Sequence, residues 1–217
     1  MIWDWGFAFE TLPRLWEGMV MTIQASVLAS AGAISLGMLW AIIRYTRIPV
    51  LSQVVTVIVE FLRGTPMLVQ LYFLFYVLPQ YGITSNAFLT GVVGMSLYFS
   101  SYCAEVFRAG LTDVPRGQWE VAKALSLPPA HVWISVILPQ AMRSVIPPTG
   151  NYIVLMFKQS ALLSTITVGE LLSAAKSIGS ETYRYIEPLT MVGVLYFAIS
   201  YPAAIGLRKL EEHLATK

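Results

Sequence analysis

The sequence predicts an all-α, polytopic membrane protein. Its 217 residues are 56% hydrophobic and only 12% charged, about half the charged fraction of an ordinary soluble domain. The charges are also unevenly spread, because residues 18–43, 64–104 and 188–207 contain no Asp, Glu, Lys or Arg. Since about 20 helical residues cross the hydrocarbon core of a bilayer, each of these uncharged segments is long enough to span it.

The composition excludes several other classes of protein, among them a soluble enzyme, a disordered chain and a nucleic-acid reader. A net charge of +2 is small for binding a phosphate backbone. Cys103 is the sole cysteine, so an intrachain disulfide and a cysteine metal site are both excluded. No G-x-x-x-x-G-K-[ST] loop or H-E-x-x-H motif occurs. We therefore expect no enzyme activity, cofactor or metal in this chain, and no nucleic-acid partner.

The N-terminal segment, residues 1–17, is rich in Trp and Phe and resembles the aromatic belt at a membrane–water boundary. The first span is expected at 18–43. Its small residues recur every four positions and so share one helix face, and small residues let helix backbones approach closely in lipid. They predict an interhelical seam and are Ala25, Ala29, Ala33, Gly37 and Ala41.

The remaining spans follow from the turn signals. The uncharged stretch 64–104 is too long for one helix and divides at the turn-rich sequence PQYGITSN, residues 79–86. Four further spans are thus expected, at 53–78, 87–110, 139–163 and 188–208. Between them, 111–138 has helical spacing of charged residues and several prolines, which predicts a solvent-facing loop with two short helices. The transmembrane region is then 18–210, with five spans, followed by a charged tail at 211–217.

The basic residues predict that the N-terminus lies outside and the C-terminus in the cytoplasm, because Lys and Arg are enriched in cytoplasmic loops. With this orientation nine basic residues fall in inner segments and three in outer ones. The loop 111–138 is then cytoplasmic. The inner residues are Arg44, Arg47, Arg108, Arg116, Lys123, Arg143, Arg208, Lys209 and Lys217, and the outer ones are Arg14, Lys176 and Arg184.

Two pairs of charged residues lie within the expected spans. Glu60 and Arg63, and likewise Glu105 and Arg108, are one helical turn apart, so each pair can neutralise itself. We favour a structural role for both pairs, although ionisable residues within spans often mark function. The sequence RGTP at 63–66 predicts a kink directly after the first pair. Broken helices survive in lipid where the freed backbone is buried or lines a cavity, which suggests a translocation path.

Several motifs resemble a known family. Residues 120–126 (EVAKALS), continuing to 137–139 (ILP), resemble the EAA motif of permease subunits in ATP-binding-cassette (ABC) importers. The surrounding sequence resembles the polar amino-acid permeases of the histidine/glutamine type. The matching segments are 60–71 (EFLRGTPMLVQL), 102–110 (YCAEVFRAG), 114–118 (VPRGQ), 138–143 (LPQAMR) and 146–151 (IPPTGN).

This resemblance implies the type I ABC importer permease fold in a bacterial inner membrane. It also implies a complex with a second permease subunit, an extracytoplasmic solute-binding protein and an ABC ATPase that binds ATP and Mg. Residues 156–158, 162–168 and 182–188 look most like the ectoine/hydroxyectoine permeases, so the expected solute is a polar amino acid or an ectoine-like compatible solute. Two other functions stay open, a non-transport membrane scaffold or receptor and a secondary transporter, although a secondary transporter would show repeated halves.

The resemblance assigns contact with the ATPase to residues of the cytoplasmic loop. Val121 and Leu125, four residues apart, form an apolar ridge, and Ala122 leaves room for close approach to a partner groove. A fully solvated loop is the alternative. Ser126 stands where the family usually has Gly, and Val121 where it usually has Ala. The coupling residues are Arg116, Gly117, Gln118, Glu120, Val121, Ala122, Lys123, Leu125 and Ser126.

Polar residues at membrane depth are the candidates for solute contact, because a zwitterion leaving water needs hydrogen bonds and charge partners. Gln159 stands where many relatives have Asp, which removes a candidate partner for a substrate cation. The alternative is that these side chains bond neighbouring helices. The candidate pathway residues are Ser101, Tyr102, Asn151, Gln159, Ser160, Ser164, Thr165 and Glu170.

Overall fold

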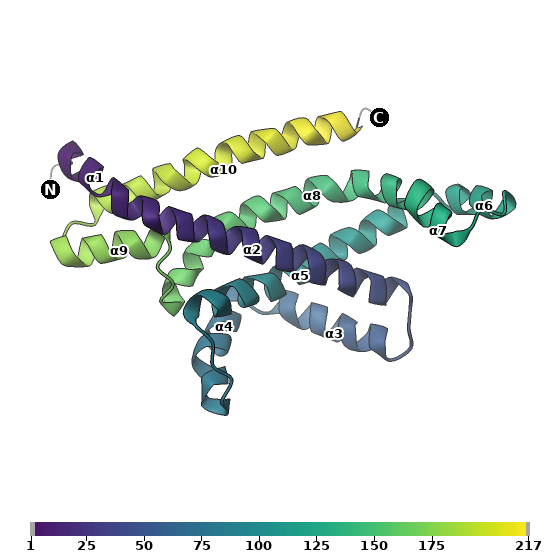
Figure 1. Ribbon diagram of the computed structural model, residues 1–217, viewed down its shortest axis with the longest axis horizontal. Coiled ribbons are helices and arrows are strands. Elements are labelled where there is room, and N and C mark those ends of the chain that lie inside the picture. Colours follow the sequence, from purple (N-terminus) through teal and green to yellow (C-terminus); the bar gives the residue numbers. More distant parts are fainter. Residues whose placement is uncertain (1–2, 216–217) are drawn as a thin grey trace.

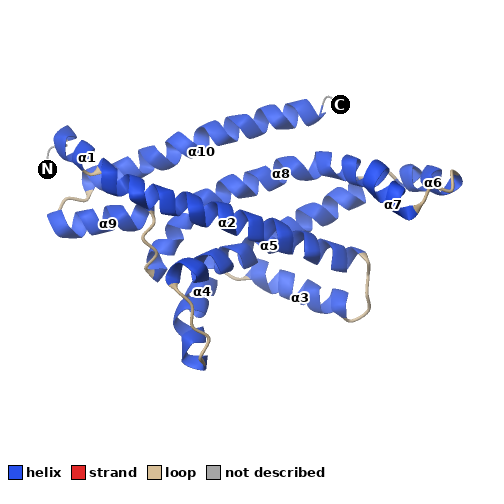
Figure 2. Cartoon of the chain, in the orientation of Figure 1, coloured by secondary structure: helices blue, strands red, loops and turns tan. Residues whose placement is uncertain are grey.

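The computed structural model describes residues 3–215, and this part of the chain is helical, with no strand (Figures 1 and 2). The helices are α1 (Trp5–Glu10), α2 (Leu12–Tyr45), α3 (Leu51–Gly64), α4 (Met67–Tyr72), α5 (Ala87–Asp113), α6 (Arg116–Ala124), α7 (Pro129–His131), α8 (Leu138–Gln159), α9 (Leu171–Thr182) and α10 (Ile186–Ala215). Short π and 3₁₀ segments cover Phe73–Val77, Leu78–Tyr81, Val132–Ile137 and Ser160–Ile166.

Helix α2 is the longest element and forms the seam that the sequence predicts. It begins at Leu12 and not near residue 18, because Pro13 fits the first helical turn and lets the helix continue outward beyond the apolar stretch. The small residues of its predicted seam are buried, and α5 is the helix packed most extensively on α2. A side chain at Gly37 would collide with this neighbour, since an ideal Cβ there lies 2.5 Å from the Cβ of Cys103. The seam prediction is therefore confirmed.

The segment expected as one span at 53–78 is broken. Helix α3 and the helical segment Met67–Tyr81 meet at an angle of 105°. Pro66 forces the residue before it out of the helical region, and Thr65 accordingly has the extended angles φ −115° and ψ 143°. In Figure 1 the segment that starts with α4 projects sideways from the bundle. The predicted kink is present, but a single straight span at 53–78 is wrong.

The number of spans depends on how bent helices are counted. Within residues 3–215, three helices are long and apolar enough to cross a membrane alone, namely α2, α5 and α10. Two more arise only if α3 with Met67–Tyr81, and the segment Pro129–Ile166 with α9, each count as one span. The span expected at 87–110 matches α5, and that at 188–208 lies within α10. The five-span count stays a prediction.

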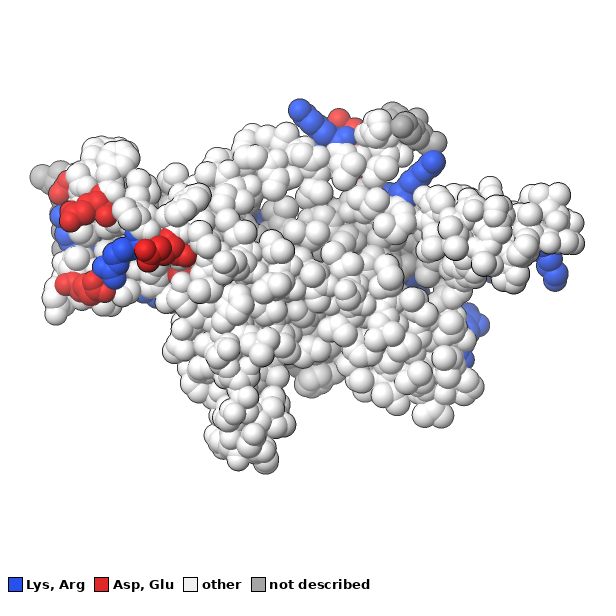
Figure 3. Space-filling view, viewed as in Figure 1, with Lys and Arg blue, Asp and Glu red and all other residues white. Residues whose placement is uncertain are grey.

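On the face shown in Figure 3, charged residues gather at the two ends of the bundle, and the surface between them is almost uncharged. At the end formed by α1 and α9, Arg14 Nη1 lies 2.7 Å from Glu181 Oε2. Arg184 bridges Asp4 and Glu187 at the same end. The Phe7 N–H donates to the Asp4 carboxylate and, with Arg184 beside it, lowers the pKa of Asp4. These contacts join the N-terminal segment to the start of α10.

The short helix α1 lies within the segment 1–17 that the sequence assigned to the interface. Its side chains Trp5 and Phe9 are 63% and 60% exposed and stack on one another. Exposed aromatic rings beside a charged helix end are typical of a membrane–water boundary. Residues 1 and 2 of this segment, and 216 and 217 of the predicted tail, lie outside the described residues.

Candidate functional site

Helix α6 carries the predicted coupling surface and lies at the far end of the bundle, next to α7 (Figure 1). Val121 and Leu125 are 58% and 65% exposed, so the apolar ridge faces away from the chain. The polar and glycine positions predicted with them are exposed too: Arg116, Gly117, Gln118, Glu120 and Lys123. Two exposed apolar residues one turn apart on a short helix form a surface that a partner groove can cover.

Ala122 differs from the expectation, because it is 3% exposed and faces its own chain. The loop helices pack into a small core next to α8, built from Val114, Ile137 and Ala141. Trp119 and Trp133 close this core with an edge-to-face contact of 5.3 Å between ring centroids. Because Ala122 is covered by its own chain, the idea that it leaves room for a partner is wrong.

Ser126 ends the α6 turn in a strained conformation. Its φ is +50°, the left-handed region in which glycine is favoured. The N–H of Ser126 donates to the Lys123 carbonyl oxygen at 3.0 Å, and that of Leu127 to the Ala122 carbonyl oxygen at 3.1 Å. These two bonds close the helix end and hold the strained residue in place, which explains why the position suits Gly.

The predicted charge pairs are rearranged around Glu105. Its Oε2 accepts from Arg108 at 2.8 Å, which confirms that pair. Its Oε1 lies 2.6 Å from Arg44 Nη1 and 3.4 Å from Arg63 Nη1. Glu60 forms no ion pair within residues 3–215, so the expected Glu60–Arg63 pair is wrong. Tertiary packing explains the difference, because α3 packs against α5 and brings Arg63 close to the Glu105 carboxylate, which also binds two other guanidinium groups.

A group of tyrosines, which we call the tyrosine cluster (Tyr98, Tyr102 and Tyr152), joins α5 to α8. The hydroxyl oxygens of Tyr98 and Tyr102 are 3.0 Å apart and share a hydrogen bond. The rings of Tyr102 and Tyr152 have centroids 5.5 Å apart. The Arg63 guanidinium lies over the Tyr102 ring, 5.7 Å from its centroid. This arrangement places aromatic faces, hydroxyl groups and a cation together within the bundle.

The predicted pathway residues do not form one site. Asn151 is exposed, Gln159 and Tyr102 are half-buried, and Ser101 and Ser160 are fully buried. Four hydroxyl groups donate to a carbonyl oxygen three residues earlier, Ser101 to Tyr98, Ser160 to Phe157, Ser164 to Ala161 and Thr165 to Leu162. Those hydroxyls thus donate to their own segment, and the Ser164 hydroxyl also accepts from Lys176 Nζ of α9 at 3.2 Å.

Glu170, predicted as a solute contact, is a buried helix cap. Its carboxylate accepts the N–H groups of Leu172 at 2.9 Å and Ser173 at 2.7 Å, at the start of α9. The Tyr196 hydroxyl of α10 also donates to it, at 3.2 Å. The side chain is fully buried. A carboxylate at a helix N-terminus satisfies otherwise free N–H groups, so the structure assigns Glu170 to folding and not to the pathway.

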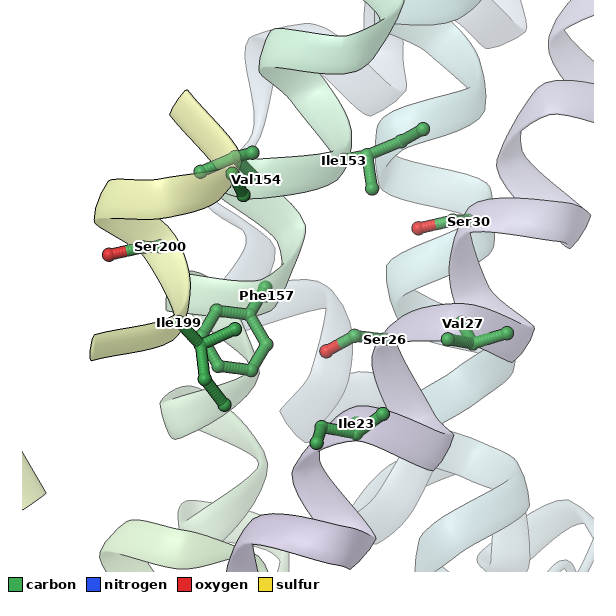
Figure 4. A pocket seen from close by; sticks show the side chains of 10 residues that line it. Ile23, Ser26, Val27, Ser30, Ile153, Val154, Phe157, Ile199 and Ser200 are labelled. Atoms are coloured by element: carbon green, nitrogen blue, oxygen red, sulfur yellow. The ribbon is translucent and has the colours of Figure 1, made fainter. Parts of the chain in front are cut away.

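A groove of about 430 Å³ lies between α2, α8 and α10 (Figure 4). Its walls are mostly aliphatic, with Ile23 and Phe157 among them. The Ser26 hydroxyl donates to the Thr22 carbonyl oxygen at 2.7 Å, and the Ser200 side chain points away from the groove in Figure 4. The groove offers no charge partner for a zwitterion, whereas the tyrosine cluster lies beside a guanidinium group.

Arg44, Tyr98 and Tyr152 belong to the charged and aromatic groups but were not predicted from the sequence. One signal was available, since Tyr98 and Tyr102 are four residues apart and therefore share a face of α5. Nothing local indicated that Arg44, at the far end of another helix, would meet Glu105. Such contacts between distant segments arise only from helix packing.

Long apolar helices, two of them broken, and a short helix with an exposed apolar ridge at one end are typical of a polytopic membrane protein that docks a partner. The chain belongs to the family described as binding-protein-dependent transport system inner membrane components, whose model matches residues 8–215. It is 43% identical over 217 residues to the probable amino-acid ABC transporter permease protein y4tG of Sinorhizobium fredii, covering 98% of this chain and 94% of that protein.

Other relatives agree with this assignment. The probable glutamine ABC transporter permease protein GlnM of Bacillus subtilis is 32% identical, with 95% of each chain covered. A chain from the crystal structure of an amino acid ABC transporter with histidines superposes with a TM-score of 0.92 at 33% identity, covering 98% of this chain and 100% of that one. The MetNI methionine ABC transporter, in an inward-facing conformation, shares the fold with a TM-score of 0.72 at 18% identity. Both curated relatives are named as permease proteins of ABC transporters.

Proposed function

We propose that the chain is the permease subunit of a bacterial ABC importer that takes up a small zwitterion. It works in the inner membrane with a second permease subunit and an extracytoplasmic solute-binding protein. A separate ABC ATPase binds ATP and Mg and supplies the energy. Closure of the ATPase pulls on the loop 111–138, and the helices tilt as rigid bodies so that the pathway faces alternately outward and inward.

The observation that carries this proposal is the exposed ridge of Val121 and Leu125. Trp119 of α6 packs on Trp133 and on the small core that includes Ala141 of α8, so force applied at the ridge reaches the transmembrane bundle. Exposed apolar side chains at a charged helix end are unfavourable in water. Burial in a groove of the ATPase removes that cost and couples the two subunits.

The coupling role is tested with Leu125→Arg in the complete reconstituted transporter. The charged side chain would be buried without a partner in an apolar groove, so ATP hydrolysis should no longer respond to solute-loaded binding protein, and uptake should fall to background. Leu210→Arg is the matched control, because Leu210 is also an exposed apolar residue, near the end of α10 but outside the loop. Normal uptake by Leu125→Arg at normal expression would contradict the coupling role.

For the solute we propose a polar amino acid or an ectoine-like compatible solute, both of which are small carboxylate-bearing zwitterions. Relatives named as amino-acid, glutamine and L-cystine permeases support the amino-acid class. Ectoine rests on the resemblance at 156–158, 162–168 and 182–188. Mass spectrometry of the ligand carried by the co-expressed binding protein separates the two, and a sugar or a metal ion in that position would exclude both.

A further inference from the structure

The charges around Glu105 do not balance. One carboxylate faces three guanidinium groups, those of Arg44, Arg63 and Arg108. Arg44 and Arg108 hold the two shorter contacts, 2.6 Å and 2.8 Å, while Arg63 Nη1 is 3.4 Å away and 41% of its side chain is exposed. Because an uncompensated cation is unfavourable within a membrane, the group can accept a further carboxylate, and Arg63 is the member free to bind it.

Arg63 also lies at the depth where a solute must pass. Tyr102 is near the middle of the 27-residue helix α5, so the guanidinium over its ring lies away from the ends of this helix. The neighbouring hydroxyl groups of Tyr98 and Tyr102 donate hydrogen bonds as well as accept them. Since one of these two hydroxyls donates to the other, the cluster offers a planar cation and one remaining hydroxyl donor beside aromatic rings.

We propose that Arg63 and the hydroxyl groups of Tyr98 and Tyr102 form the subsite that receives the carboxylate of the transported solute. A guanidinium group binds a carboxylate with two parallel hydrogen bonds, and the aromatic faces cover the apolar part of the molecule. Gln159 lies seven residues after Tyr152, almost two full turns along α8 and on the same face, where its amide oxygen accepts from an ammonium group. This subsite rests on the proposed function of the chain as a solute permease.

The position of Arg63 favours a solute carboxylate over the phosphate of a lipid headgroup. Arg63 is the second-last residue of α3, and at 1.5 Å per residue about 18 Å of helix separates it from Leu51, where α3 begins. A headgroup stays at the bilayer surface, near the helix ends, whereas Tyr102 lies near the middle of α5 and Arg63 lies over its ring. The exposed Arg47, in the loop between α2 and α3, suits the surface and serves as the control position.

The test uses the complete transporter in phosphatidylcholine vesicles and in vesicles with added phosphatidylglycerol. ATP-driven uptake of radiolabelled L-glutamine and of ectoine is measured for the wild type and for Arg63→Gln, Arg63→Lys and Arg47→Gln. Stimulation of ATP hydrolysis by loaded binding protein is measured in parallel. Size-exclusion chromatography checks that each variant assembles.

Arg63→Gln should lower solute transported per ATP hydrolysed at least about tenfold, as expected for loss of a charge-assisted hydrogen bond. Arg63→Lys, which keeps the charge without the planar pair of donors, should retain part of the uptake. Both should keep stimulated ATP hydrolysis, and Arg47→Gln should transport normally. This pattern, the same in both lipid compositions, supports the subsite.

Three results would overturn the subsite while leaving the proposed function intact: wild-type uptake by Arg63→Gln, failure of both Arg63 variants to assemble, or loss of uptake that depends on phosphatidylglycerol. The second assigns Arg63 to folding, and the third assigns it to an anionic lipid. If the wild type itself takes up neither solute, the proposed solute class fails, and the subsite fails with it.

Discussion

Replacing Gly37 with alanine should loosen the packing of α2 on α5, because it adds a methyl group where no space exists. An ideal Cβ at this position lies 2.5 Å from the Cβ of Cys103 and 2.9 Å from the carbonyl oxygen of Ser100. Carbon atoms in contact are about 3.5–4.0 Å apart, so the two helices must separate by roughly 1 Å. Overpacking of this kind costs about 1–3 kcal/mol.

Part of this cost is offset by the helix itself, since alanine is a better helix former than glycine by up to about 1 kcal/mol. A net loss of about 1–2 kcal/mol in the free energy of unfolding corresponds to roughly 3–6 °C in Tm for a chain of this size. The measurement is thermal unfolding of the purified permease in detergent, followed by tryptophan fluorescence.

The control is Gly206→Ala in α10, where an added Cβ meets no atom within 4 Å. It should leave Tm unchanged or raise it slightly. Adding Cys103→Gly to Gly37→Ala removes the closer of the two clashing atoms and should restore part of the lost stability, a coupling that distant sites do not show. If Gly37→Ala is as stable as Gly206→Ala, the seam is not close-packed and this reasoning fails.

Three other predictions concern orientation, charge and strain. In a Cys103→Ser background, an impermeant thiol reagent should label Ser180→Cys in intact cells but Asp113→Cys only after permeabilisation, and identical labelling would reject the orientation. Glu105→Gln leaves three arginines without their shared counter-charge and should lower the free energy of unfolding by about 3 kcal/mol. Titration with a denaturing detergent measures this change, and an unchanged midpoint would argue against the charge group. Ser126→Gly removes the backbone strain caused by the φ of +50° and should stabilise the loop by about 1 kcal/mol. Hydrogen exchange of the loop amides should then be slower, and exchange at the wild-type rate would mean that the strain is absent.

The amino-acid sequence by itself determined the class of protein and most of its helices. Several uncharged segments of about 20 residues or more indicate membrane spans, and a helix satisfies its own backbone hydrogen bonds in lipid. Small residues spaced by four determined which face of α2 would be buried, and Pro66 determined where a helix would break. Each of these results depends on interactions within one segment, so the local sequence was sufficient.

The tertiary structure decided how the charged and polar side chains are used. Glu60 and Arg63 have the spacing of an ion pair, yet Arg63 binds Glu105 at 3.4 Å, because helix packing places a carboxylate from another segment within reach. The sequence predicts Glu170 as a solute contact because it is a carboxylate near the expected span, but its side chain caps α9 and accepts a hydrogen bond from the Tyr196 hydroxyl. The spacing of residues along one helix defines which side chains of that helix can contact each other, whereas distances between helices decide which ion pair or hydrogen bond forms. Those distances depend on the packing of the whole bundle.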